Sequence, residues 1–460
     1  MRRLPGQAAR GCARVLHLLA HVALTLTVLV AVLGAAAAWR LSQGPVRMDW
    51  LTQRLEAALN ADDAPTQVAI GSSALAWEGF SRGVDRPLDL QLTDITVTAP
   101  SGRRQIDLPR VEVSLSLGAL LQGRLEPRAI EVDGARITLR RGPDGTTSLD
   151  LGTLNEATDS TAPEPPAEAG PSPAEMLLRE LVRPAADDRA PRDGPARGMF
   201  SQLRRILVRN AAVVVIDRQL GATWQAPEAE IDLVRRPAGG VDGTALLRLA
   251  LGDQTATLTA NAVLETGAER THVRARLSPV APAALARAAP RLERLSALDA
   301  PVTLEAAVDL DAALQPTRFH ATATVGAGAV EVRGDRVALE SAVMVVDGTP
   351  TLIRLETAQV AVQGHEGGPL THLRAGGTLV RQFGQFQASV TLDLDQLAFA
   401  DLPRLWPAAT GGGARPWIVG NIPTGTARNG HVAAQVVGRD DFSEARITAL
   451  TGTLDGQDLT

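Results

Sequence analysis

The most constraining feature of this sequence is an alternation of apolar and polar residues that recurs along most of the chain. In residues 128–145, Ile130 and Val132 alternate with charged residues, and the alternation resumes after Asp133-Gly134. A period of two residues is typical of a β-strand with one apolar face. An Asp-Gly pair between two such runs is a signal for a hairpin turn. This stretch therefore predicts two antiparallel strands that are joined at Gly134.

The same unit occurs a second time at residues 204–217. Ile206 corresponds to Ile130 in the first copy, and Asn210 stands where Gly134 stood. Glycine and asparagine are both residue types that accept the positive φ of a tight turn. We therefore expect a repetitive β architecture in which Gly134 and Asn210 occupy equivalent turn positions.

Alternation continues almost without interruption after residue 200, and short Gly- and Asp-containing turns separate the runs. One wet and one dry face are typical of antiparallel sheets, whereas buried parallel strands are apolar throughout. The prediction is a mainly β protein with one long, curled antiparallel sheet and a few short helices. The residues that we expect on its apolar face include Leu247, Leu249, Leu251, Leu258, Leu304, Val308, Leu392 and Leu394.

Periodicity alone leaves two interpretations of that apolar face open. The face can close against other elements as an ordinary sandwich core, or it can line an open groove that holds acyl chains. In both cases Asp393 and Asp395 fall on the opposite, solvent-facing side, where the default interpretation is a solvated surface and not an acid–base pair.

The N-terminal region predicts a membrane anchor. Residues 15–39 are apolar and, as a helix, would span ~37 Å, which exceeds the ~30 Å hydrocarbon core of a bilayer. Arginines are more frequent before this segment than after it, so residues 1–14 are predicted to form a cytoplasmic tail. A cleaved signal peptide is the alternative, although the apolar run is longer than a usual signal sequence. Residues 40–64 are predicted to contain a juxtamembrane helix capped by Asp49.

The remaining chain divides by composition. A first β region is predicted at 65–152 and a long β region at 200–460. Between them, residues 153–199 are rich in Pro, Ala and acidic residues, as in TAPEPPAEAG, and such a segment can bury little apolar surface. We expect a largely disordered linker that is dispensable for folding, in which only residues 174–182 could form a brief amphipathic helix; a partner-binding segment is the alternative. Within the long region, the segments 282–298 and 401–408 are predicted to be helical.

Several kinds of chemistry find no support in the sequence. The chain contains no lysine, which excludes a P-loop or Schiff-base lysine, and the single cysteine, Cys12, permits no intrachain disulfide. A net charge of −5 with no basic cluster argues against nucleic-acid binding. His365 and His372 could be loop ligands for a metal, but Gly-rich surface turns explain them at least as well. The prediction is a non-enzymatic protein without a cofactor.

Two stretches resemble a known family. The run GALLQGRLEPRAIEVDGARITLRRGPDG at 118–145 is similar to the signature of the AsmA-like superfamily, in particular its YhdP/TamB-type branch. The segment ARPWIVGNIPTGTARNG at 414–430, with Arg415, Trp417 and Ile418, resembles a central segment of that branch.

The resemblance implies a bacterial envelope protein that is anchored once in the inner membrane, with its N-terminus in the cytoplasm and its bulk in the periplasm. It also implies a longer chain than these 460 residues. Its expected partners are phospholipid, the inner membrane and an outer-membrane or periplasmic protein. The expected function is to bind or conduct phospholipid along a hydrophobic β-groove between the two membranes. The alternative is a tethered assembly factor for outer-membrane proteins that acts by strand addition.

Overall fold

The computed structural model describes the greater part of residues 43–459. The described ranges are 43–60, 67–77, 88–98, 104–116, 126–143, 147–150, 181–182, 202–252, 254–265, 270–312, 315–332, 335–365, 367–406, 414–439 and 444–459. Seven single positions before residue 43 are also described, and they are 25, 28, 29, 32, 36, 39 and 40.

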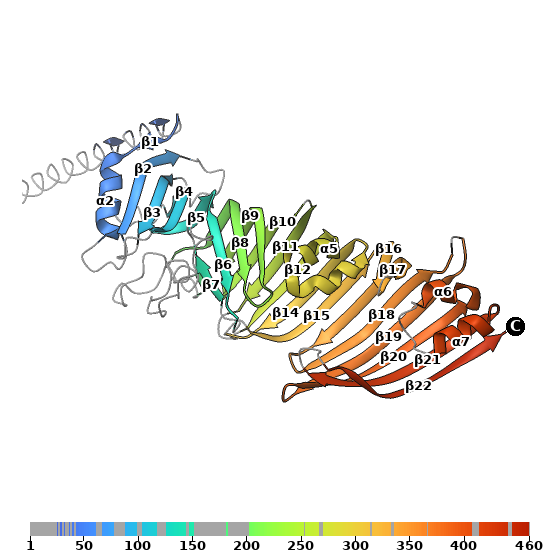
Figure 1. Ribbon diagram of the computed structural model, residues 1–460. Coiled ribbons are helices and arrows are strands. Elements are labelled where there is room, and N and C mark those ends of the chain that lie inside the picture. The colour runs from blue at the N-terminus through green and yellow to red at the C-terminus, as the bar shows by residue number, and fades with distance from the viewer. Residues whose placement is uncertain are drawn as a thin grey trace, which may run out of the picture.

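All 22 described strands belong to one sheet, which runs as a long twisted ribbon from the N-terminal to the C-terminal part (Figure 1). Alternating sequence gives long strands here because each can present its apolar side to the same face. The strands are β1 (Val46–Arg47), β2 (Gln67–Trp77), β3 (Leu88–Thr98), β4 (Arg104–Leu115), β5 (Pro127–Asp133), β6 (Arg136–Arg141), β7 (Thr147–Asp150), β8 (Arg205–Asp217), β9 (Ala222–Arg235), β10 (Val241–Leu251), β11 (Gln254–Leu264), β12 (Thr271–Val280), β13 (Leu298–Asp299), β14 (Val302–Leu310), β15 (Pro316–Val325), β16 (Gly328–Val332), β17 (Asp335–Gly348), β18 (Leu352–Gln363), β19 (Leu370–Gln382), β20 (Gln385–Ala398), β21 (Thr426–Arg439) and β22 (Arg446–Gln457).

Short helices occur at the three places that the sequence predicts, within 40–64, 282–298 and 401–408, and α7 at 414–421 is a further one that was not predicted. They are α2 (Asp49–Leu59), α5 (Pro282–Ala288), η2 (Pro290–Ala297), η3 (Phe399–Asp401), α6 (Leu402–Leu405) and α7 (Ala414–Asn421). The prediction that Asp49 caps the first helix is wrong. Met48 is the N-cap residue and makes no side-chain capping bond, and Asp49 lies in the first turn.

The N-terminal strands have a covered apolar face. Ile70, Ile95, Val111 and Ile130 are buried together, and Leu55 of α2 packs against them. The helix is fixed to β2 by a hydrogen bond from the Ile70 amide to Glu56 Oε1 at 2.7 Å. In this part of the molecule the apolar face is therefore a closed core.

The two repeated units lie side by side, but neither is a hairpin. β5 and β6 follow one another along β8, and both pair with it in parallel, with Ile130 opposite Ile206 and Ile137 opposite Val213. The sequence correspondence of the two copies is thus their register in the sheet, while the hairpin prediction is wrong. A two-residue hairpin of type I′ needs two consecutive residues with positive φ. Each copy has one, namely Gly134 (φ 75°) and Asn210 (φ 50°), so the chain bends there and continues.

The two bends are joined to each other. The Gly134 amide donates to the Arg209 carbonyl at 3.0 Å, and Asn210 Nδ2 donates to Asp133 Oδ1 at 2.7 Å. The prediction that Gly134 and Asn210 occupy equivalent positions with positive φ is confirmed. All other pairings among the described strands are antiparallel, so this parallel junction is the point at which the first β region joins the long one.

The segment at 153–199 makes at least one firm contact with the fold. Only Leu181 and Val182 of this segment are described; Leu181 is 0% exposed in the N-terminal core, and Arg235 Nε donates to its carbonyl at 2.9 Å. Both residues are helical and belong to the segment 174–182, the one part of the linker for which the sequence allows a brief amphipathic helix. Parallel strands need a long crossover connection, and this segment supplies the one between β7 and β8.

The predicted anchor at 15–39 lies outside the described residues except at positions 25, 28, 29, 32, 36 and 39, each of which is helical. Among the helices that the structure does describe, none combines the length and apolarity needed to cross a bilayer.

Candidate functional site: an apolar sheet face with a roofed hollow

One face of the sheet carries continuous rows of apolar residues that stand directly opposite one another on neighbouring strands. We name three rows after their members on β14: the Leu304 row, the Ala306 row and the Val308 row. The Leu304 row crosses from β9 to β22 through Ala229, Leu247, Leu258, Leu277, Leu304, Ala323, Met344, Ala358, Ala375, Leu392, Val432 and Gly452. Four of the predicted lining residues, Leu247, Leu258, Leu304 and Leu392, thus lie in one line.

The Val308 row extends across the sheet from β1 to β22. In its central part, Val273 stands opposite Val308, which stands opposite Phe319. The Ala306 row lies between the other two and consists of small residues in the middle of the sheet. Its members there are Ala245, Ala260, Ala275, Ala306 and Ala321. The long β region therefore has a small-residue floor between two rows of mostly larger side chains.

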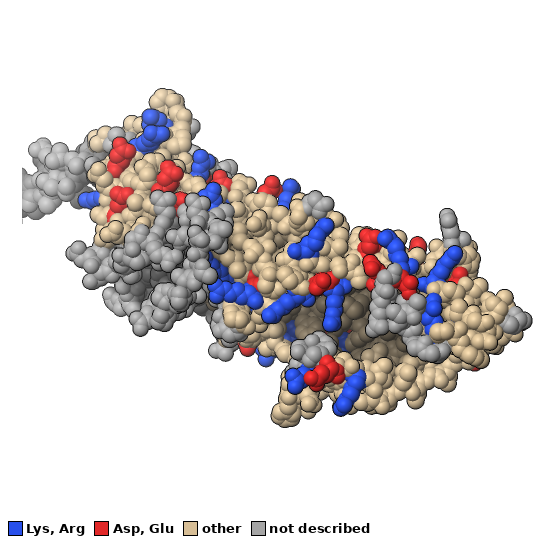
Figure 2. Space-filling view, viewed as in Figure 1, with Lys and Arg blue, Asp and Glu red and all other residues tan. Residues whose placement is uncertain are grey.

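This apolar face is largely uncovered in the long β region. Leu304 is 36% exposed and Leu392 is 37% exposed, whereas core residues of the N-terminal part are below 10%. Leu251 is the exception among the predicted lining residues: it is 2% exposed because it packs against Ala284 of α5. The two interpretations therefore apply to different parts of the face: it is a closed core under α2 and under α5, and it is open at Leu304 of β14 and Leu392 of β20. Figure 2 shows the surface hollowed in the C-terminal part, with charged side chains along the margins.

The opposite face is polar, and ion pairs connect its neighbouring strands. Arg276 Nη1 lies 2.9 Å from Glu305 Oε1, and His431 Nδ1 lies 2.7 Å from Asp393 Oδ1. The predicted solvent-facing position of Asp393 is confirmed by its exposed side chain. No group of three or more His, Cys, Asp or Glu side chains among the described residues is arranged to hold a metal ion.

On this polar face, hydrogen bonds stabilise the charged form of Asp395. Partial burial opposes ionisation of its carboxyl group, but hydrogen bonds from the amides of His372 and Gln396 and from the His372 ring outweigh burial and lower its pKa. His372, a candidate metal ligand by sequence, is instead paired with this carboxylate at 2.9 Å. His365 is paired likewise with Asp401 at 2.6 Å.

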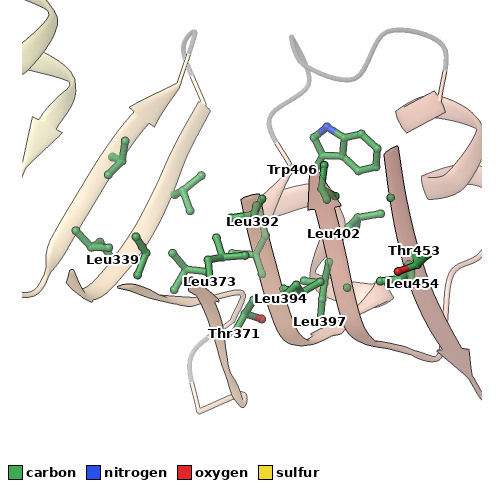
Figure 3. Close-up of a pocket in the computed structure, with 18 residues that line it drawn as sticks. Leu339, Thr371, Leu373, Leu392, Leu394, Leu397, Leu402, Trp406, Thr453 and Leu454 are labelled. Atoms are coloured by element: carbon green, nitrogen blue, oxygen red, sulfur yellow. The ribbon is translucent and has the colours of Figure 1, made fainter. Parts of the chain in front are cut away.

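Near the C-terminal end, the apolar face deepens into a hollow of about 620 Å³. Leu392 and Leu394 line it, together with residues of α6 that the sequence did not single out. In Figure 3, Leu402 and Trp406 stand on one side of the hollow, and Leu373 and Leu394 lie on the strands. The full lining is Val330, Val337, Leu339, Val360, Val362, Thr371, Leu373, Leu392, Leu394, Leu397, Leu402, Leu405, Trp406, Gly430, Val432, Gly452, Thr453 and Leu454.

The predicted family-motif residues fall at two separate places. Gly134 and Asn210 form the joined bends of the parallel junction. Arg415, Trp417 and Ile418 lie on α7, where Ile418 packs against the cluster of Phe399 and Leu402 and Trp417 is 62% exposed. Sequence alternation could have identified most strand residues of the hollow. The α6 residues carry no such signal, because a helix of four residues shows no period.

Comparison with known proteins gives one match. The model of the AsmA family matches residues 87–268, a stretch that contains the parallel junction and the first strands of the open face, and this match supports a place for the chain in the AsmA-like superfamily. Neither the curated proteins nor the solved structures yielded a match to this chain.

Proposed function

We propose that this protein binds phospholipid on the open apolar face and conducts it along the sheet between the inner and outer membranes, without catalysing a reaction. In this proposal it is a YhdP/TamB-type member of the superfamily. Residues 15–39 anchor it once in the inner membrane, with the N-terminus in the cytoplasm and the sheet in the periplasm. The observation that carries the proposal is the exposure of Leu304 and Leu392 within an unbroken apolar row.

The chemistry of the face suits a moving hydrocarbon chain. Each methylene that leaves water contributes ~0.8 kcal/mol, so a long acyl chain on this face is held firmly. The rows contain mostly Leu, Val, Ala and Gly, and they step from strand to strand by ~4.8 Å. Because the lining is so uniform, the binding free energy changes little as the chain slides. Soluble proteins rarely expose such extensive apolar surface without a ligand or partner.

A photo-crosslinking experiment in cells tests the proposal. A photoreactive residue at position 249, 304 or 392 should yield phospholipid adducts, identified by mass spectrometry. The matched controls are positions 305 and 393, which are adjacent in sequence but lie on the polar face. Equal labelling of both faces, or no adduct at any position of a folded protein, contradicts lipid conduction.

One observation favours a second candidate, strand addition. Every residue of β22 is exposed, and the only described strand that pairs with it is β21. A strand can bind an extended segment of another protein along its edge through main-chain hydrogen bonds. The same experiment with the photoreactive residue at Thr448 separates the two functions. Polypeptide adducts at β22 without lipid adducts at position 304 would favour an assembly factor for outer-membrane proteins.

A further inference from the structure

We infer that the roofed hollow is a holding site for one hydrocarbon chain of a lipid, and that Arg415 is the positioning residue that keeps its roof in place. The roof consists of residues 399–406, which include η3 and α6. This inference rests on the proposed function. It goes beyond that function by assigning a distinct, partly covered binding site on a face that is otherwise open. It also gives a role to Arg415 of α7.

The roof reaches across the apolar face. It follows β20 in the chain, yet Leu405 packs against the cluster that contains Leu339 of β17 and Val362 of β18. On the other side, Leu402 is buried with Phe399 and Ala427 of β21, and Trp406 packs against them. Since β18 and β19 lie between β17 and β20 in the sheet, the segment bridges several strands and covers part of the hollow.

Polar bonds fix the roof to the loop between β18 and β19. Asp401 is 4% exposed, and its Oδ1 lies 2.6 Å from His365 Nδ1. Arg404 Nη1 donates to the Gly364 carbonyl at 3.2 Å. A Cβ at Gly364 would come within 2.2 Å of Asp401 Cγ, so a larger residue at this position would displace the roof.

Arg415 holds the other end of the roof. Its Nε donates to the Trp406 carbonyl at 2.6 Å and its Nη2 to the Pro403 carbonyl at 3.0 Å. The last carbonyls of a helix have no partner within the helix, and a guanidinium can satisfy two of them at once. The arginine of the Arg-x-Trp-Ile segment therefore clips α7 onto the end of α6, beside the Trp406 side chain that lines the hollow.

The lining determines what the hollow can take. It contains no ionisable side chain, and Thr371, Thr453 and the Trp406 indole supply its only polar side-chain groups. A phosphate or other charged headgroup would be left there without a partner, at a large cost in desolvation. The volume of about 620 Å³ lies within the range of ~300–1,000 Å³ that is usual for single small ligands. Leu392 and Val432 belong to both the hollow and the Leu304 row, so a chain can enter by sliding from the open face.

The test compares a position in the roofed hollow with a position on the open face of the same protein. The full chain is reconstituted in vesicles of phosphatidylethanolamine and phosphatidylglycerol, with a photoreactive residue at position 373 in the hollow or at position 304 on the open face. Arg415→Met removes the two hydrogen bonds that join α7 to the end of the roof. Arg439→Met, which breaks an exposed ion pair with Glu444 at the opposite end of β21, is the matched control.

We expect Arg415→Met to lower the yield of lipid adducts at position 373 by at least tenfold relative to position 304, since it removes two charge-assisted hydrogen bonds and the loss of even one changes an equilibrium by about tenfold. Arg439→Met should leave the ratio unchanged. Trp406→Ala, which keeps both Arg415 bonds but shortens the roof, should lower the ratio as well, and it replaces Arg415→Met if that variant fails to fold. An unchanged ratio in the folded variants overturns the holding site while adducts at position 304 uphold conduction. Absence of adducts at both positions overturns conduction and the holding site together.

Discussion

At the scale of single residues, two positions with positive φ define the junction of the sheet. Gly134 and Asn210 bend neighbouring parallel strands at the same level, and the amide of one bend and the side chain of the other link them. An extra residue at each bend keeps the apolar side chains before and after it on one face. The alternation of Ile130 and Val132 can thus continue at Ile137 without a change of face.

Replacement of Gly134 tests this requirement. Gly134→Val should lower the free energy of unfolding by at least ~1 kcal/mol, because a β-branched residue is poorly tolerated at positive φ. Gly134→Asn is the matched control, because Asn210 also adopts positive φ at the neighbouring bend. This substitution should lower the free energy of unfolding much less than Gly134→Val does. Urea unfolding of the two variants measures the difference. Equal free energies of unfolding would show that the bend does not depend on its residue type.

At the scale of elements, the connection between β7 and β8 is more than a spacer. A parallel pair requires a crossover, and in this crossover Leu181 is fully buried beside Leu203 and Ile70. The carbonyl of Val182 also accepts a hydrogen bond from the Gly240 amide at 2.9 Å. A segment whose overall composition is typical of disorder can therefore contain a short apolar stretch that packs into the core.

Shortening the buried side chain of Leu181 should lower the stability of the protein. Leu181→Ala is expected to lower the free energy of unfolding by ~2–5 kcal/mol, as for other fully buried leucines. Val182→Ala serves as the comparison, because its side chain is only half-buried and should lose less. Chemical denaturation followed by circular dichroism provides the measurement. A Leu181→Ala variant as stable as the parent protein would show that this buried contact contributes little to the stability of the fold.

At the scale of the whole molecule, one sheet serves two purposes. Its apolar face forms closed cores where α2 and α5 cover it, and it is exposed farther along the sheet, at Leu304 of β14 and Leu392 of β20. The cores and the hydrogen-bonded ladder stabilise the ribbon, so the open stretch is free to bind a ligand. Figure 1 shows these helices as separate patches along an otherwise continuous sheet.

A pair of identical substitutions distinguishes the open and covered parts of the face. Leu251→Asp should destabilise the protein by several kcal/mol, because it buries a carboxylate without a partner beneath α5. Leu304→Asp should leave the protein folded but block lipid passage, because the carboxylate at this exposed position reaches water. Thermal unfolding and limited proteolysis compare the two variants. Similar destabilisation by both would mean that the face at Leu304 is a closed core.

The sequence by itself determined which residues share a strand face and where the backbone needs a positive φ. Leu247, Leu258, Leu304 and Leu392 were assigned to one face from alternation, because a strand places every second side chain on the same side. The match between Ile130 and Ile206 coincides with their register in the sheet, but the pairing of the two copies, and its parallel direction, came from the structure alone.

Only the tertiary structure decided what covers that face. Leu251 and Leu304 have the same alternating neighbourhood in sequence, yet one is 2% and the other 36% exposed, because α5 packs over the first and no described element covers the second to the same extent. Leu405 meets Leu339 only because the strands between them bring β17 and β20 within reach of one short helix. Alternation is a property of one strand, whereas coverage depends on contacts between residues far apart in the chain.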